Sequence, residues 1–165
     1  HAPSIFACRR TAKGATGLAE TGLRAHLTYL LSEAERQLNR HLAAELAAEG
    51  VSVEQWRILR ALSDGHGHSM TDLAEAVLMP HPTLTKAVDR LVEEAVVYRR
   101  QDTADRRRVA VFLSDLGRDL VARLDRRAAG HHAGVEAAFG AGRTERLMRE
   151  LEALATACRT LDRRG

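Results

Sequence analysis

Cysteine and long apolar runs are scarce in this sequence. Only two of its 165 residues are cysteine, Cys8 and Cys158, and they lie far apart in the chain. Neither belongs to a metal-binding or redox spacing, which excludes a disulfide framework and a cysteine-ligated zinc site. No apolar run approaches the roughly 18 residues that span a bilayer. We therefore expect a cytoplasmic protein with no membrane partner and no cofactor.

Motifs that carry catalytic chemistry are missing too. The sequence contains no nucleophile elbow and no phosphate-binding glycine loop, and both would be expected in common enzyme classes. The histidines at 66, 68, 131 and 132 come nearest to a metal-binding pattern, but no two histidines have the i, i+4 spacing that directs two imidazoles at one ion. We expect neither an enzyme nor a metal-regulated protein.

Positive charge is in slight excess and is concentrated in one segment. The chain carries 25 basic and 22 acidic residues, so its net charge is 25 − 22 = +3. Residues 99–108 contain five arginines and two aspartates, so this segment alone carries 5 − 2 = +3. A local cluster of this kind indicates a surface that contacts nucleic acid, although a solvated loop has the same composition.

Length and periodicity predict one folded domain over residues 23–165. Residues 1–22 show no clear periodicity, and we interpret them as an N-terminal arm or tag remnant. Leucines recur at steps of three and four from Leu23 to Leu46, which predicts a long first helix that ends near Gly50.

Two cap patterns predict the next two helices. Ser52 followed by Gln55 forms a capping-box pattern ahead of an apolar run. Ser69 followed by Asp72 repeats this pattern after a turn over residues 63–68.

A further helix and a hairpin follow. Pro82 is suited to the first turn of a helix that runs to about Glu94, with an inner stripe formed by Leu84, Val88 and Leu91. Two β-branched and aromatic runs, 96–98 and 109–113, are the only strand signals in the chain and predict a hairpin with an arginine-rich tip. The predicted fold class is therefore mainly α with a small β-hairpin.

The end of the chain predicts two more long helices. Ser114 is placed to cap the first, and glycines at 140 and 142 separate it from the second. The last helix carries apolar residues at alternating steps of four and three: Leu147, Leu151, Leu154, Cys158 and Leu161. This spacing is typical of a coiled-coil seam and predicts contact with a second chain.

The order of these elements predicts a DNA-binding surface. A helix of about 14 residues is roughly 21 Å long and fits a major groove about 12 Å wide. We expect His81, Thr83 and Lys86 to meet base edges. The full set of expected DNA contacts is Ser69, Thr71, His81, Pro82, Thr83, Thr85, Lys86, Arg90, Arg106 and Arg107. For Arg90 the alternative is an ion pair with Asp89.

Three motifs carry a family resemblance. They are Met-Thr-Asp-Leu-Ala at 70–74, Pro-Thr-Leu-Thr-Lys-Ala-Val-Asp-Arg-Leu at 82–91, and Asp-Arg-Arg at 105–107 followed by Val-Phe-Leu-Ser-Asp-Leu-Gly at 111–117. Across about residues 23–162 the chain resembles the multiple-antibiotic-resistance regulator (MarR) family. The resemblance implies a winged helix-turn-helix, here over residues 52–113. By the same resemblance, Asp105 would brace the wing and Arg107 would enter the minor groove.

The resemblance also implies a homodimer. Helices from residues 23–50 and 114–162 of two chains would interlock and hold two recognition helices about one DNA turn apart on a pseudo-palindromic operator. The implied function is a sequence-specific transcription regulator, a repressor released by a small-molecule effector. A sequence-nonspecific DNA-binding or adaptor protein is the alternative.

The sequence departs from the family pattern at two turns. Leu78-Met79-Pro80 stands where the family usually has Gly-hydrophobic-Ser, which removes a flexible residue and a side-chain cap. Ala95 replaces the usual glycine after the recognition helix, and a positive φ there would cost about 1 kcal/mol. We therefore expect an altered turn ahead of the recognition helix.

An effector pocket is a further hypothesis. Trp56, with His26 and Tyr29, could bind a small aromatic or phenolic ligand between the dimer helices and the DNA-binding region. The alternative is that Trp56 is a core residue, which is the more common role of a tryptophan in a short helix.

Overall fold

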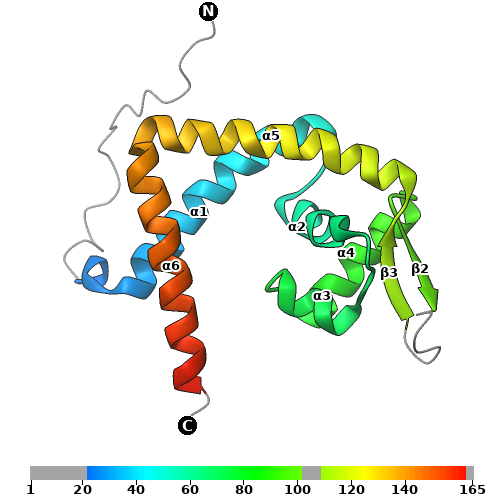
Figure 1. Cartoon of the computed structure of the whole chain (residues 1–165), viewed down its shortest axis with the longest axis horizontal. Helices are drawn as coiled ribbons and strands as arrows, with labels where there is room; N and C mark the ends of the chain where they lie inside the picture. The colour runs from blue at the N-terminus through cyan, green and yellow to red at the C-terminus, as the bar shows by residue number, and fades with distance from the viewer. Residues whose placement is uncertain (1–21, 102–108, 163–165) are drawn as a thin grey trace, which may run out of the picture. The chain divides into compact units, whose positions relative to one another are not determined.

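The computed structural model describes residues 22–101 and 109–162, which form six α-helices and a small sheet (Figure 1). The helices are α1 (Leu27–Leu46), α2 (Val53–Ala61), α3 (Met70–Ala76), α4 (His81–Glu93), α5 (Asp115–Phe139) and α6 (Ala141–Asp162), and the strands are β1 (His68–Ser69), β2 (Val97–Gln101) and β3 (Val109–Leu113). The predicted fold class, mainly α with a small hairpin, is confirmed.

The chain forms two compact units. The larger unit, residues 24–128, contains α1 to α4, the sheet and the first half of α5. The other unit includes the rest of α5 and all of α6. The predicted DNA-binding elements therefore lie together in the larger unit.

Serine caps begin three helices, as predicted. Ser52 and Gln55 form a reciprocal capping box, in which the Gln55 N–H donates to Ser52 Oγ at 3.2 Å and the Ser52 N–H donates to Gln55 Oε1 at 3.0 Å. Ser69 Oγ accepts the Asp72 N–H at 3.2 Å at the start of α3. Ser114 Oγ accepts a backbone N–H in the first turn of α5 at 3.0 Å. Each cap satisfies an N–H that the helix itself leaves unpaired.

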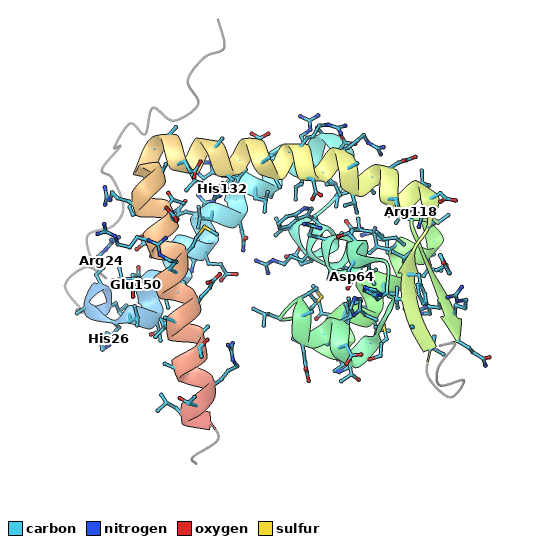
Figure 2. All side chains as sticks on the ribbon, viewed as in Figure 1. Arg24, His26, Asp64, Arg118, His132 and Glu150 are labelled. Carbon is cyan, nitrogen blue, oxygen red and sulfur yellow. The ribbon has the colours of Figure 1, made fainter. Side chains whose placement is uncertain are left out.

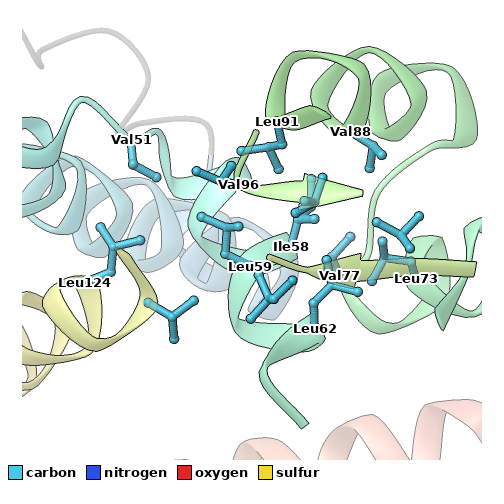
Figure 3. Close-up of a cluster of buried hydrophobic side chains, with 14 of the residues drawn as sticks. Val51, Ile58, Leu59, Leu62, Leu73, Val77, Val88, Leu91, Val96 and Leu124 are labelled. Atoms are coloured by element: carbon cyan, nitrogen blue, oxygen red, sulfur yellow. The ribbon is translucent and has the colours of Figure 1, made fainter. Parts of the chain in front are cut away.

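The core of residues 24–128 collects the inner faces of these elements (Figure 3). The stripe predicted on α4 is fully buried, since Leu84, Val88 and Leu91 are each 0% exposed. The other side chains with no exposed surface are Leu46, Ile58, Leu59, Leu73, Val111 and Leu124. Burial of this stripe determines which face of α4 points to solvent.

The sheet has three antiparallel strands in the order β1-β3-β2. Strands β2 and β3 are the predicted hairpin, with Tyr98 opposite Phe112. Strand β1 corrects the expectation that only two strands exist, because His68 pairs with Val111 on the free edge of β3. At two residues it is too short to show the alternation from which a strand is recognised.

Ion pairs attach the first half of α5 to the end of α1 and to α2. The carboxylate of Glu49, just after α1, lies 2.9 Å from Arg123 Nε and 3.8 Å from Arg127 Nη2. Asp125 lies 3.5 Å from Arg60 Nε. The hydrogen bond from Arg123 lowers the pKa of Glu49, against the opposing effect of burial.

The leucine seam predicted on α6 is largely exposed in the single chain. Leu147, Leu151 and Leu161 are 46%, 38% and 67% exposed. Cys158, which belongs to the same predicted seam, is also exposed in the single chain. The one buried side chain of α6 is that of Thr144, which is 6% exposed.

Candidate nucleic-acid interface

One face of α4 is polar and fully available to solvent. The helix has 13 residues and is therefore about 20 Å long. The predicted contact residues His81, Pro82, Thr83, Thr85, Lys86 and Arg90 are all exposed. They lie outside the buried stripe, so the structure brings these six predicted residues onto the accessible part of one helix.

The hydroxyl groups predicted to contact DNA differ in the hydrogen bonds that they make within the protein. Ser69 Oγ donates to Asp72 Oδ2 at 2.7 Å while it accepts the Asp72 N–H. Thr85 Oγ1 donates to the backbone oxygen of His81 at 2.9 Å. Thr71, in the first turn of α3, is exposed. Each hydroxyl still has lone pairs or a rotatable proton with which to contact a phosphate or base.

The turn between α3 and α4 keeps its hydrogen bonds despite the departure noted in the sequence. Leu78 adopts φ 55°, the left-handed conformation that favours glycine. Its N–H donates to the Glu75 oxygen at 3.3 Å, and the Met79 N–H donates to the Ala74 oxygen at 3.0 Å. These two bonds form the usual glycine-type helix end with a leucine in the strained position.

Two further sequence expectations at the ends of α4 are confirmed. Pro80 is the N-cap of the helix and provides no side-chain cap, as its chemistry requires. Ala95 adopts φ 57°, so the position does require a positive φ. Its carbonyl accepts a 2.8 Å hydrogen bond from Ser114 Oγ, which also caps α5.

An ion pair joins α4 to the wing. Asp89 Oδ1 on α4 accepts a hydrogen bond from Arg99 Nη2 on β2 at 2.7 Å. The alternative considered for Arg90, a pair with Asp89, is therefore not what forms. Among the ion pairs of residues 22–101 and 109–162, none involves Arg90. Its guanidinium remains available on the exposed face of α4.

Aromatic packing stiffens the base of the wing. The rings of Tyr98 and Phe112 stack with centroids 5.6 Å apart, and the Arg100 guanidinium lies 4.6 Å from the Phe112 centroid. Gly67 lies so close to the ring that a Cβ there would be 2.3 Å from Phe112. The strands that lead to the wing tip are thus held by contacts on one face of the hairpin.

The tip residues predicted to bind DNA or brace the wing, Asp105, Arg106 and Arg107, lie outside the described residues.

A cavity of about 480 Å³ lies between residues of α1, α2 and the end of α3. It is lined by Glu35, Trp56, Arg57, Arg60, Ala61, Ala76, Val77 and Leu78. The indole N–H of Trp56 is buried and has no hydrogen-bond acceptor among the described residues. An unsatisfied buried donor is costly to the fold.

The structure separates the three residues proposed for the effector site. Trp56 lines this cavity, whereas Tyr29 lines a smaller groove along α1 and His26 is the N-cap of α1 (Figure 2). Arg57 and Arg60, and not His26 or Tyr29, are among the residues that line this cavity with Trp56. The i, i+4 spacing of Trp56 and Arg60, which places both on one helix face, was the available signal.

His68 and His132 each lie beside a carboxylate, of Asp64 and Glu136 respectively. His68 Nε2 lies 2.8 Å from Asp64 Oδ2 near the start of β1. Burial tends to raise the pKa of Asp64, but hydrogen bonds with the His66 backbone and the His68 ring lower it overall. Within residues 22–101 and 109–162, no group of three potential ligands could hold a metal ion. Nor does any helix described there combine the length and apolarity needed to cross a membrane.

The elements that build this surface match a known family. Helices α2, α3 and α4 and strand β2 all lie within residues 49–108, and these residues match the model of the MarR family. Over these residues the chain is similar to the MarR family. The resemblance recognised from the three motifs is thereby confirmed.

Two curated relatives match over a longer stretch. The HTH-type transcriptional regulator TtmR of Methylorubrum extorquens (strain PA1) is 27% identical over 123 residues, which cover 74% of this chain and 63% of the relative. The HTH-type transcriptional repressor YetL of Bacillus subtilis (strain 168) is 29% identical over 109 residues, covering 65% of this chain and 64% of the relative. The chain thus spans less than two thirds of the length of these two proteins.

Solved structures share the fold. The transcriptional repressor CouR, bound to a 23-mer DNA duplex, has a TM-score of 0.75 at 23% identity and covers 81% of this chain and 95% of its own. NadR in complex with 4-hydroxyphenylacetate has a TM-score of 0.68 at 25% identity and covers 79% of this chain and 92% of its own. Both matches support the winged-helix architecture of the MarR family.

Proposed function

We propose that this protein is a DNA-binding transcription regulator that acts as a homodimer and is not an enzyme. The single observation that carries the proposal is α4, a 13-residue helix with one stripe fully buried and the opposite face polar and exposed. A helix of this length fits the major groove. The names of TtmR and YetL, a transcriptional regulator and a transcriptional repressor, support the same class of function.

Each side chain of the surface has a role in this proposal. His81, Thr83 and Lys86, in the first half of α4, read base edges, with Pro82 beside them. Thr85 and Arg90, together with Ser69 and Thr71 of α3, contact phosphates. Arg106 and Arg107 reach the minor groove from a wing braced by Asp105.

The second copy of the chain covers the exposed seam of α6. Leu147, Leu151 and Leu161 are each more than a third exposed, and their four-and-three spacing suits a helix of a partner. Two copies related by a two-fold axis present two α4 helices, so the operator is a pseudo-palindrome.

A small aromatic or phenolic acid occupies the cavity beside Trp56 and acts as the effector that releases the repressor from its operator. Trp56 lines this cavity with its aromatic ring system and offers an apolar surface to the ring of such an acid. Arg57 and Arg60 line the same cavity and provide positive charge. Glu35 also lines it, and its carboxylate pairs with Arg57. NadR, a relative in fold, has been solved with 4-hydroxyphenylacetate.

The DNA proposal is tested by binding of the full chain to a genomic duplex that carries a palindrome and to a scrambled duplex. The palindrome should bind at least about 1,000-fold more tightly. Lys86→Ala should weaken binding by roughly tenfold and reduce its salt dependence, because one cation is lost from each subunit. Arg126→Ala, which removes an exposed arginine from α5, is the matched control and should leave the affinity almost unchanged. Equal affinity for both duplexes would favour the sequence-nonspecific alternative.

A further inference from the structure

Lysine is nearly absent from this chain. Lys13 and Lys86 are its only two lysines, so arginine supplies the other 23 of its 25 basic residues. Lys13 lies outside the described residues, whereas Lys86 is exposed on α4, within the surface proposed to bind DNA. A guanidinium stays charged in proteins, but a lysine amine is a nucleophile whose charge is removed by acylation. Of the lysine and arginine residues proposed to contact DNA, Lys86 is therefore the only one whose charge acylation can remove.

The charge of Lys86 is not neutralised by its neighbours on α4. Within residues 22–101 and 109–162, no ion pair and no side-chain hydrogen bond involves Lys86. Asp89, three residues further along the helix, is placed to pair with it, but the Asp89 carboxylate accepts a 2.7 Å hydrogen bond from Arg99 instead. Arg90, one helical turn from Lys86, is exposed and adds a second positive charge. Two neighbouring cations without an acidic partner repel each other, and this arrangement indicates a surface suited to an anion.

We propose that Lys86 is acetylated by an acyl phosphate and that this modification switches off operator binding. This inference rests on the DNA-binding function proposed above. Cations that contact the phosphates of DNA also attract the phosphoryl group of an acyl phosphate. Arg90 lies one helical turn from the reacting amine, so it can hold the phosphoryl group while the acyl carbon faces Lys86. The operator and the acyl phosphate compete for the same cations, so bound DNA protects Lys86.

The acyl transfer needs no reactant besides the acyl phosphate. The Lys86 ammonium first gives a proton to water, and the neutral Nζ then attacks the carbonyl carbon of the acyl phosphate. A C–N amide bond forms and the C–O bond to the phosphate breaks. Inorganic phosphate leaves with the electron pair of that bond and takes up the proton that the nitrogen loses. The product is a neutral amide, so each subunit loses one positive charge from its recognition helix.

Acetyl phosphate is the probe for this reaction. The full chain is incubated with it, the modified lysines are identified by mass spectrometry, and the Kd for the palindromic duplex is measured before and after treatment. Wild type should be acetylated at Lys86, and its Kd should rise about tenfold. The slope of log Kd against log salt concentration should become shallower by about two, because one cation is lost from each of two subunits. Palindromic duplex added before acetyl phosphate should reduce the acetylation of Lys86 severalfold.

Three variants separate Lys86 from other amines. Lys86→Arg keeps a cation but removes the amine that reacts, so its Kd should be the same before and after treatment, whatever its starting value. Lys13→Arg is the matched control, because it removes the only other lysine of the chain, and its Kd should rise on treatment as that of wild type does. Lys86→Gln resembles the neutral product, and untreated it should bind DNA within about threefold of treated wild type.

Three results would overturn the inference. Lys86 could remain unmodified, acetylated Lys86 could leave the Kd unchanged, or treated Lys86→Arg could lose as much affinity as wild type, which would assign the effect to another amine. In each case untreated wild type still distinguishes the palindromic duplex from the scrambled one. Failure of the proposed DNA-binding function would instead remove that preference before any treatment.

Discussion

Asp89 on α4 and Arg99 on β2 form a 2.7 Å ion pair that links the recognition helix directly to the wing. The two side chains are about half and one third exposed. Exposed pairs contribute less than about 1 kcal/mol to stability, so the pair is better suited to fix an orientation than to hold the fold together. If α4 and the wing contact adjacent grooves, their relative orientation determines whether both can bind at once.

Asp89→Asn should therefore weaken operator binding while the protein stays folded. We expect the Tm to change by less than about 3 °C and the Kd to rise about fivefold, measured by fluorescence anisotropy on a labelled duplex. The double variant Asp89→Asn with Arg99→Gln should weaken binding by less than the sum of the two single losses, since both changes remove the same interaction. Strictly additive losses would contradict this coupling.

Ala95→Gly should stabilise the protein. Ala95 holds φ 57°, and glycine reaches this conformation without a Cβ clash, so we expect a gain of about 1 kcal/mol in the free energy of unfolding. Urea denaturation measures the change. Ala122→Gly is the matched control, because Ala122 lies within α5 at an exposed position and there glycine should destabilise by about 1 kcal/mol. Loss of stability in both variants would argue against strain at Ala95.

The Glu49 interaction should make stability depend on pH in the acidic range. Arg123 lowers the pKa of Glu49 in the folded protein, so the unfolded chain binds a proton at this group more readily than the folded chain does. The stabilisation is therefore complete above the ordinary pKa of glutamate, about 4.3, and is lost as the pH falls through the lower folded pKa.

Glu49→Gln checks this sign. The variant should have a lower Tm than wild type at pH 7, and the difference should shrink as the pH is lowered below about 4. Glu75→Gln is the control, because it removes the same charge at an exposed position of α3. Glu75 takes part in no ion pair among the described residues. Its effect on Tm should be small at every pH. A pH-independent loss in Glu49→Gln would instead indicate a packing effect.

A charge placed in the α6 seam should separate the two copies. Leu151 is 38% exposed in the single chain, and Leu151→Glu would bury an unpaired carboxylate in the proposed interface. We expect a monomer by sedimentation velocity and loss of tight operator binding. Ala153→Glu adds the same charge at an exposed position of α6 outside the seam and should remain dimeric. A monomeric wild type would remove the basis of this prediction and of the pseudo-palindromic operator.

Local signals located the helices well. Ser52, Ser69 and Ser114 each cap the helix that the sequence predicts after them, because a cap acts over three residues and is readable in a short window. The buried stripe of α4 and the pairing of β2 with β3 also follow from local periodicity. A positive φ at Ala95 was considered because the family pattern has glycine there, whereas an altered turn was expected at Leu78 and the structure instead keeps the left-handed conformation with a leucine.

Contacts between distant segments were not predictable in the same way. The partner of Asp89 is ten residues away, on another element, although its neighbour Arg90 was the obvious candidate. The cavity combines side chains of α1, α2 and the end of α3, so no single window contains it. This is why Trp56 was recognised while Arg57, Arg60 and Leu78 were not assigned to it.

The sequence by itself determined the positions of the helices, the hairpin and the solvent-facing side of α4, because caps and apolar periodicity act between residues three or four apart. Only the tertiary structure decided that Arg99 rather than Arg90 pairs with Asp89, that two residues at 68–69 complete the sheet, and that Leu78 opens onto the cavity of Trp56. Those outcomes depend on how whole elements pack, and packing brings together atoms whose separation along the chain carries no periodic signal.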